Sequence, residues 1–291
     1  MTHTSEKEIK WPEPNALKAG LYLVATPIGN LRDISLRALD VLASVDVIYC
    51  EDTRVSGKLL KAYSISKPLA VYNDHSDEKK RALILKAIEE GRAIALISDA
   101  GSPLISDPGY KLVRDCMAKN LMVTNIPGAC AAISAMQISG LPSDQFCFLG
   151  FLPAKEKARR AALEQWKTVG ATLVFYETGP RLLAALKDIR QSLGGRELSV
   201  VREITKMFEQ VVFDHVDNLI AKYENDGAPK GEIVLVVEGA KDEVWTKEAL
   251  EQELVEAMKS MKTKEAANYV SGKSGAPKKE LYEIALELKS S

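Results

Sequence analysis

The stretch that most constrains the fold is a short apolar run followed by a long polar loop. Ala93 to Ile97 (A-I-A-L-I) has the continuous apolar pattern of a buried strand. Ser98 to Gly109 (S-D-A-G-S-P-L-I-S-D-P-G) is too rich in Gly, Pro, Asp and Ser to extend that strand. Because open α/β sheets bind ligands at the carboxyl ends of their strands, we expect this loop to line a binding site. An ordinary strand-to-helix connection is the alternative.

Strands and helices alternate through the first half of the chain. The pattern predicts strands over residues 21–25, 45–50, 69–72, 93–97 and 121–125, separated by helices. Such alternation indicates βαβ units and a parallel sheet. The first strong interruption is Gly140 to Asp144 (G-L-P-S-D), so we predict an N-terminal α/β domain over residues 20–141.

The rest of the chain predicts a second domain and a helical segment. Residues 197–202 and 206–213 are close enough to form a hairpin, which favours a mixed sheet in a C-terminal α/β domain over residues 142–240. Residues 241–291 predict three helices, with a turn at Ser271 to Gly275. They form either a helix-turn-helix-like appendage or a helical cap. Residues 1–19 predict a flexible polar tail.

Composition excludes several classes of protein. The net charge of −1, from 39 basic and 40 acidic residues, argues against nucleic-acid binding through bulk charge. There is no apolar run of about 18 residues and no signal-peptide core, so we expect a cytoplasmic protein. The four Cys and three His lack metal-ligand spacing, so we expect no metal. The dinucleotide and P-loop fingerprints are also missing.

Several segments together resemble a known family. They are T-P-I-G-N-L-R-D at Thr26 to Asp33, E-D-T-R at Glu51 to Arg54, Y-N-D-H at Tyr72 to His75, the Asp99 loop, P-G-A-C-A at Pro127 to Ala131, G-F-L-P-A-K at Gly150 to Lys155, and F-Y-E-T at Phe175 to Thr178. In this order they resemble the ribosomal RNA small subunit methyltransferase I family of the tetrapyrrole methylase superfamily. Ala25 departs from the family's usual Gly.

The resemblance implies a fold and an activity. The fold is α/β, with two domains of the tetrapyrrole-methylase type, a cofactor cleft between them, and a small helical C-terminal segment. The activity is S-adenosylmethionine-dependent 2′-O-methylation of a cytidine ribose in the decoding centre of 16S ribosomal RNA, by a homodimer. The alternatives are a methyltransferase that acts on a tetrapyrrole or corrin, and an RNA-binding module without catalysis.

The resemblance also implies which residues line the cofactor cleft. The expected cofactor-binding residues are Thr26, Pro27, Asp99, Ala100, Gly101, Ser102, Ile105, Pro127, Gly128, Ala129, Cys130, Tyr176, Lys230, Gly231 and Glu232.

The ribose hydroxyl is a weak acid, so a base near it would speed its methylation. His75 is the histidine within the matching segments, and its ordinary pKa suits this role. Glu177 and Glu203 are the alternatives for the base, and His75 otherwise caps a helix or contacts RNA.

A local group of cations could bind the RNA despite the net charge. Four of them lie within six residues after the G-F-L-P segment, and three more lie in the first half. The expected RNA-binding residues are Arg32, Arg54, Lys58, Lys155, Lys157, Arg159 and Arg160. Alternatively, the run at residues 155–160 is a solvated helix face.

Overall fold

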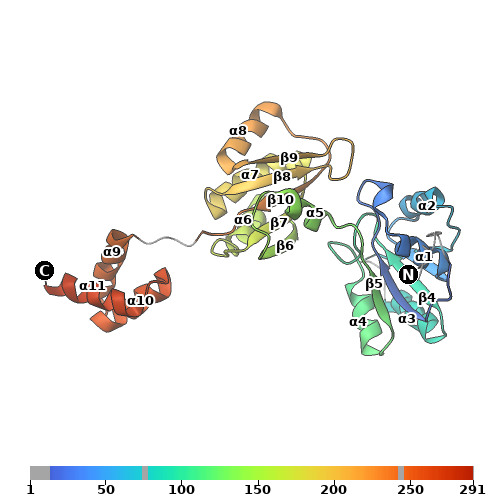
Figure 1. The fold of residues 1–291 in the computed structure, drawn as a ribbon, viewed down its shortest axis with the longest axis horizontal. Coiled ribbons are helices and arrows are strands. Elements are labelled where there is room, and N and C mark those ends of the chain that lie inside the picture. The colour runs from blue at the N-terminus through green and yellow to red at the C-terminus, as the bar shows by residue number, and fades with distance from the viewer. Residues whose placement is uncertain (1–13, 74–77, 242–245, 291) are drawn as a thin grey trace, which may run out of the picture. The chain divides into compact units, whose positions relative to one another are not determined.

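The computed structural model describes residues 14–73, 78–241 and 246–290. The chain divides into two compact units, Met1–Gly239 and Ala240–Ser291. The first unit holds two five-stranded sheets, one in a first lobe (residues 20–138) and one in a second lobe (residues 146–237) (Figure 1). Both lobes lie within one unit, so the domain boundary at residues 141–142 stays a prediction.

The sheet of the first lobe is parallel throughout, as the alternating pattern predicts. Its strand order is β3-β2-β4-β1-β5. The strands are β1 (Gly20–Val24), β2 (Val47–Cys50), β3 (Leu69–Val71), β4 (Ala93–Ile97) and β5 (Val123–Ile126). The helices are η1 (Leu31–Asp33), α1 (Leu36–Ser44), α2 (Thr53–Ala62), α3 (Glu78–Glu89), α4 (Tyr110–Ala118) and α5 (Ala131–Ile138).

Helices cover both faces of this first sheet. Helices α1 and α2 pack on one face, and α3 and α4 pack on the other. All five residues of β4 are buried, as its uninterrupted apolar run predicts. Since every strand is parallel, the loops that follow β1, β4 and β5 emerge at one edge of the sheet, where ligands bind in such folds.

The sheet of the second lobe is mixed, in the order β6-β7-β10-β8-β9. Strands β6 and β7 are parallel, and the other pairs are antiparallel. The elements are β6 (Phe146–Phe151), α6 (Glu156–Glu164), β7 (Thr172–Thr178), α7 (Gly179–Leu193), β8 (Glu197–Arg202), β9 (Gln210–His215), α8 (Val216–Asp226) and β10 (Glu232–Val237). The predicted hairpin is therefore present, but its second strand begins four residues later than predicted.

The two faces of the second sheet have different partners. Helices α6, α7 and α8 pack on one face, around Phe175 and Leu235. On the other face, the side chains of Val174, Val201 and Val234 contact α5, which follows the last strand of the first sheet. Helix α5 therefore joins the lobes, and the second sheet turns one face toward the ligand-binding edge of the first.

The second unit is a group of three helices with its own apolar core. Helices α9 (Lys247–Met258), α10 (Thr263–Ser274) and α11 (Lys278–Ser290) bury residues such as Leu254, Val270 and Leu281. Helix α10 continues through most of the turn predicted at residues 271–275 and ends at Ser274, where Gly275, with a φ of 73° that suits glycine, caps it.

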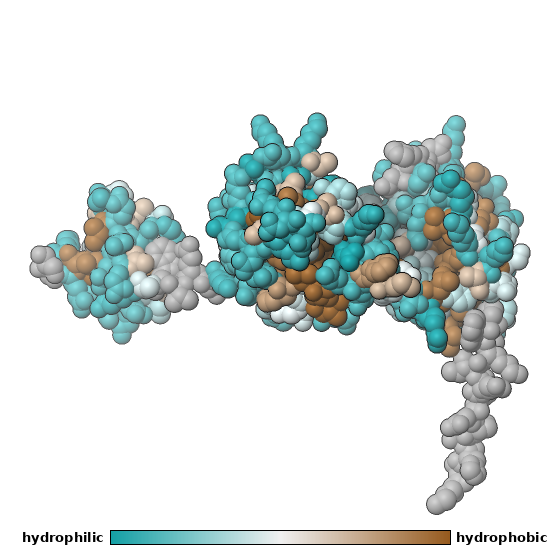
Figure 2. Space-filling view, turned by 90° about the horizontal axis from the view of Figure 1, so that it is seen from above, coloured by the Kyte–Doolittle hydropathy of each residue, from teal (hydrophilic) through white to brown (hydrophobic). Residues whose placement is uncertain are grey.

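The described surface is mostly polar, with hydrophobic patches among hydrophilic side chains on the face that Figure 2 displays. Met207 and Phe208, in the turn before β9, are 90% and 66% exposed. None of the helices in the described ranges has the length and hydrophobicity needed to cross a bilayer.

Candidate functional site

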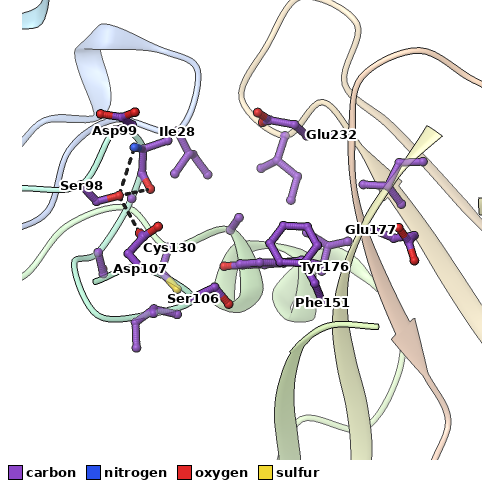
Figure 3. A pocket seen from close by; sticks show the side chains of 18 of the residues that line it. Ile28, Ser98, Asp99, Ser106, Asp107, Cys130, Phe151, Tyr176, Glu177 and Glu232 are labelled. Atoms are coloured by element: carbon purple, nitrogen blue, oxygen red, sulfur yellow. Dashed lines mark hydrogen bonds between the residues drawn. The ribbon is translucent and has the colours of Figure 1, made fainter. Parts of the chain in front are cut away.

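A pocket of about 440 Å³ lies where the two lobes meet. Its volume is within the range of small-molecule sites. The first lobe contributes the loop after β4, and the second contributes β7, β10 and the end of β8 (Figure 3). The lining residues are Ile28, Glu51, Ser98, Asp99, Ala100, Gly101, Ser102, Ile105, Ser106, Asp107, Cys130, Ala131, Phe151, Tyr176, Glu177, Thr178, Val201, Ile204, Glu232, Ile233 and Val234.

The loop after β4 is held by its own polar side chains. The Ser98 hydroxyl donates to Asp107 Oδ2 at 2.6 Å and accepts from the Ala100 amide at 3.2 Å. Leu104 and Ser106 have φ angles of 71° and 67°, which L-residues rarely adopt. These internal bonds offset such strain, which is commonly found at functional sites.

Thr26 fastens this loop to the end of β1. Its amide donates to the Gly101 carbonyl at 2.9 Å, and the Gly101 amide donates back to the Thr26 carbonyl at 3.1 Å. The buried Thr26 hydroxyl donates to the Ser98 carbonyl at 3.0 Å. In the loop after β5, Gly128 lies so close to Ala25 that an added Cβ would be 2.9 Å from the Ala25 Cβ. Thr26 and Gly128 thus set the backbone around the pocket.

The sequence predicted part of this lining. Of the expected cofactor-binding residues, the pocket includes Asp99, Ala100, Gly101, Ser102, Ile105, Cys130, Tyr176 and Glu232. The lining does not include Thr26, Pro27, Pro127, Gly128, Ala129, Lys230 or Gly231. Ala129 still holds the loop, because its carbonyl accepts from the Ser102 hydroxyl at 3.1 Å.

Sequence reasoning missed the apolar floor of the pocket. Val234 pairs in register with Tyr176 on one side and with Val201 on the other, so the three side chains share one face of the sheet. β8 and β10 are apolar on both faces, so their pattern does not show which face borders the pocket. Asp107 was detectable, because it lies in the same polar loop as Asp99.

The pocket is acidic. Glu51, Asp99, Asp107 and Glu232 line it, and no Lys or Arg occurs among the described lining residues. Asp99 Oδ1 also accepts from the Asp52 amide at 3.2 Å, which links the loop to the start of α2. Burial raises the pKa of Tyr176, so its phenol is neutral at physiological pH. An acidic pocket with an aromatic wall suits a cationic ligand with a flat ring.

The structure does not place the two candidate glutamates as bases in this pocket. Glu177 borders it, but its fully buried side chain points away from Tyr176 and pairs with Arg181 at 3.1 Å (Figure 3). Glu203 is not among the lining residues and accepts from Lys206 Nζ at 2.9 Å. The hydrogen bond from Lys206 lowers the pKa of Glu203, which makes it a weaker base. His75 lies outside the described residues.

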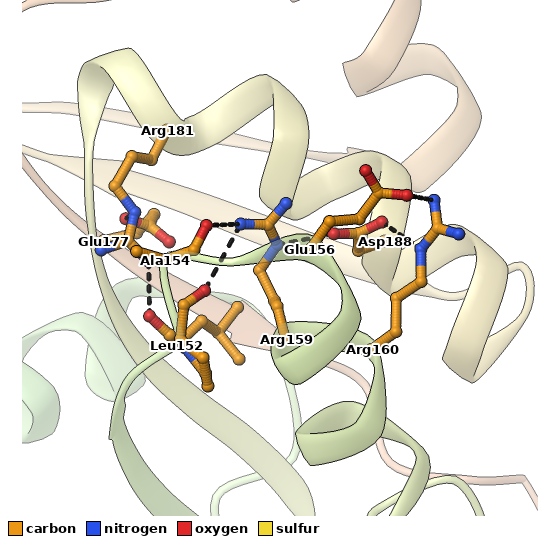
Figure 4. A network of polar contacts seen from close by, with 9 residues as sticks. Leu152, Ala154, Glu156, Arg159, Arg160, Glu177, Arg181 and Asp188 are labelled. Atoms are coloured by element: carbon orange, nitrogen blue, oxygen red, sulfur yellow. Dashed lines mark hydrogen bonds and ion pairs between the residues drawn. The ribbon is translucent and has the colours of Figure 1, made fainter.

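The structure corrects the RNA-binding hypothesis at Arg159. This side chain is only 6% exposed, and its Nε lies 2.6 Å from Asp188 Oδ2 (Figure 4). Arg160 is partly exposed and pairs with both Asp188 and Glu156, each at 2.6 Å. A guanidinium that is buried against a carboxylate cannot also contact a phosphate, so we withdraw Arg159 from the RNA surface.

The other expected RNA-binding residues are exposed. Arg32, Lys58, Lys155 and Lys157 all lie at the surface. Arg54 is exposed too, but it pairs with Asp52 at 2.6 Å. The searched part of the chain has no group of His, Cys, Asp and Glu side chains that could hold a metal ion.

Comparisons with known proteins agree with this geometry. Residues 20–220 match the family model of Tetrapyrrole (Corrin/Porphyrin) Methylases, and residues 246–289 match the RsmI C-terminal HTH domain. Among solved structures, the methyltransferase CobJ superposes with a TM-score of 0.57 at 15% identity, covering 76% of this chain and 95% of that one. A diphthine synthase gives a TM-score of 0.55 at 13% identity, covering 75% and 89%. At these identities the likeness establishes the fold alone.

Two relatives extend the match over nearly the whole chain. Ribosomal RNA small subunit methyltransferase I of Erythrobacter litoralis is 53% identical, over 94% of this chain and 97% of its own length. The protein of the same name from Pasteurella multocida is 46% identical, over 94% and 99%. The chain therefore belongs to the ribosomal RNA small subunit methyltransferase I family, within the tetrapyrrole methylases.

Proposed function

We propose that this small-subunit ribosomal RNA methyltransferase transfers a methyl group from S-adenosylmethionine to the ribose 2′-oxygen of a cytidine in the decoding centre of 16S RNA. Family membership makes the chain a methyltransferase of small-subunit ribosomal RNA. The nucleoside and the oxygen that is methylated belong to our proposal. The observation that carries it is the acidic pocket at the carboxyl ends of the parallel strands.

The chemistry of the pocket fits the methyl donor. S-adenosylmethionine carries a positive sulfonium and an ammonium group. Carboxylates from Glu51, Asp99 and Asp107 line the cavity, together with that of Glu232, which also pairs with Lys206 at 2.9 Å. Apolar side chains, among them Ile105 and Phe151, suit the adenine ring. When bound, the donor supplies an electrophilic methyl group whose transfer leaves a neutral thioether.

The loop after β4 is the part of the pocket that we assign to the donor. Gly101 lets a ligand approach the main chain closely, and Asp99 offers a carboxylate for its polar groups. The other expected cofactor-binding residues lie outside the lining of the pocket. Among them, Thr26, Gly128 and Gly231 determine the path of the main chain next to it. Orientation by such a preformed site contributes roughly 7 to 11 kcal/mol in well-aligned cases.

His75 remains our proposed base for the ribose hydroxyl. A base of suitable pKa is worth about 10² to 10⁴-fold in rate. The pairing of Glu177 with Arg181, and of Glu203 with Lys206, supports His75 over these two alternatives.

Exposed cations and the C-terminal unit supply the RNA contacts that we propose. Lys155 precedes α6 and Lys157 lies on its first turn, and Arg32 and Lys58 lie on the first lobe. We further propose a homodimer in the cytoplasm, where ribosomal subunits are found. Strand β9 is at the edge of its sheet and exposes Phe213, which supports a protein contact there.

The test is to incubate the protein with methyl-labelled donor and small ribosomal subunits, and to digest the RNA to nucleosides. We expect the label in 2′-O-methylcytidine. A parallel reaction with a corrin precursor tests the small-molecule alternative. Label in the precursor, label on a base, or RNA binding without transfer would each contradict the proposal.

A further inference from the structure

Two arginines of the second lobe hold the main chain rather than an external ligand. Arg159 lies on α6 and Arg181 lies on the first turn of α7 (Figure 4). Arg159 pairs with Asp188, and Arg181 pairs with Glu177. Arg159, Asp188 and the Glu177 side chain are each at most 6% exposed, a degree of burial that charged side chains reach only when paired.

These guanidiniums bind three consecutive carbonyls. Arg181 Nη2 donates to the Leu152 carbonyl, and Arg159 Nη1 donates to those of Ala154, at 3.0 Å, and Pro153, at 3.4 Å. Residues 152–154 connect β6 to α6 and lie outside both. Their carbonyls therefore accept no hydrogen bonds from a neighbouring strand or helix turn. The two arginines donate these hydrogen bonds instead.

The segment held in this way begins next to a wall of the pocket. Phe151 lines the pocket and is 54% exposed, so few protein contacts hold its ring. The ring meets Tyr176 edge to face, with centroids 5.5 Å apart. The preceding Gly150 has a φ of 64°, and the register of β6 on β7 shifts between Phe148 and Phe151. Phe151 is the last residue of β6 and still pairs in register with Tyr176, so the anchoring of residues 152–154 holds the chain on the other side of the ring.

We infer that Arg159 and Arg181 are positioning residues, which hold the Leu152–Ala154 carbonyls and thereby place the Phe151 ring in the wall of the pocket. This inference rests on the proposed function, and it assigns to the Phe151 ring a contact with the methyl donor. Asp188 orients the Arg159 guanidinium from behind by accepting a hydrogen bond from its Nε, and Glu177 pairs with Arg181 through their opposite charges.

A double-mutant cycle between Arg181 and Phe151 tests this inference. Its readout is the dissociation constant for S-adenosylhomocysteine, measured by calorimetry. Arg181 is the better arginine to change, because its side chain is 32% exposed and its loss threatens folding less than that of Arg159. We expect Arg181→Met and Phe151→Ala each to weaken binding by about 5- to 50-fold, and the double variant to bind within about twofold of Phe151→Ala. Arg181→Lys, which keeps one donor for Leu152, should recover part of the loss.

Arg190→Met is the matched control. Arg190 lies on the same helix and forms an exposed ion pair with Asp217 at 2.7 Å, far in sequence from the pocket wall. The Arg190→Met substitution should leave the affinity for S-adenosylhomocysteine unchanged. Losses that multiply in the double variant, or a folded Arg181→Met protein with wild-type affinity, would overturn the inference. If the wild type itself does not bind S-adenosylhomocysteine, the proposed function fails instead.

Discussion

Replacing Arg159 by Met should strongly lower the free energy of unfolding of the protein. It should leave the salt dependence of the protein's affinity for RNA unchanged. The substitution removes the 2.6 Å ion pair with Asp188 and the bonds to Ala154 and Pro153. Breaking a buried pair on one side costs about 3 to 5 kcal/mol. Arg160 still neutralises the other oxygen of Asp188 in the variant, so we expect the lower end of that range. Urea denaturation monitored by circular dichroism gives the free energy of unfolding.

Lys157→Met is the matched control, since Lys157 lies on the same helix and is exposed. Its effect on the free energy of unfolding should stay within about 0.5 kcal/mol. If Arg159 instead contacted a phosphate, its replacement would flatten the slope of log K against log salt by about 0.7 to 0.9. A loss of stability below about 1 kcal/mol together with such a flatter slope would refute the buried role of Arg159.

Two further predictions concern titratable groups. Burial raises the pKa of Glu177 above its ordinary value of about 4.3, so its contribution to stability is lost as pH rises through the folded-state pKa. The free energy of unfolding of the wild type, relative to Glu177→Gln, should therefore fall as pH rises above about 4, whereas a relative increase would mean that Arg181 outweighs burial. His75→Ala should lower kcat on ribosomal subunits by about 10²-fold and leave the affinity for S-adenosylhomocysteine intact, and a kcat within about twofold of wild type would exclude His75 as the base.

The regular elements near the pocket were predictable because local patterns determine them. The uninterrupted apolar run of β4 indicates a buried strand. The Gly- and Pro-rich loop after it indicates where that strand ends. The late start of β9 was not predictable in this way. Glu203 and Thr205 have φ angles of 53° and 65°, and Lys206 bonds to Glu203 and to the distant Glu232. Such tertiary bonds leave no trace in the pattern of apolar residues.

Periodicity carries two signals at the site that bear on these residues. Tyr176 and Glu177 are neighbours in one strand, so their side chains point to opposite faces of the sheet, although both residues border the pocket. Arg159 lies four residues before the buried Leu163 on one helix, so it shares the face that packs on the lobe. Its partner Asp188 is 29 residues away in sequence, which is why the pairing itself could not be foreseen.

The central claim is that the loop after β4 binds the methyl donor, and calorimetry with S-adenosylhomocysteine tests it most directly. Asp99→Ala removes a carboxylate from the pocket wall and should weaken binding by about 1.5 to 3 kcal/mol, or roughly 10- to 150-fold. Asp144→Ala, at an exposed position between α5 and β6, should bind as the wild type does. Wild-type affinity in a folded Asp99→Ala protein would contradict the account.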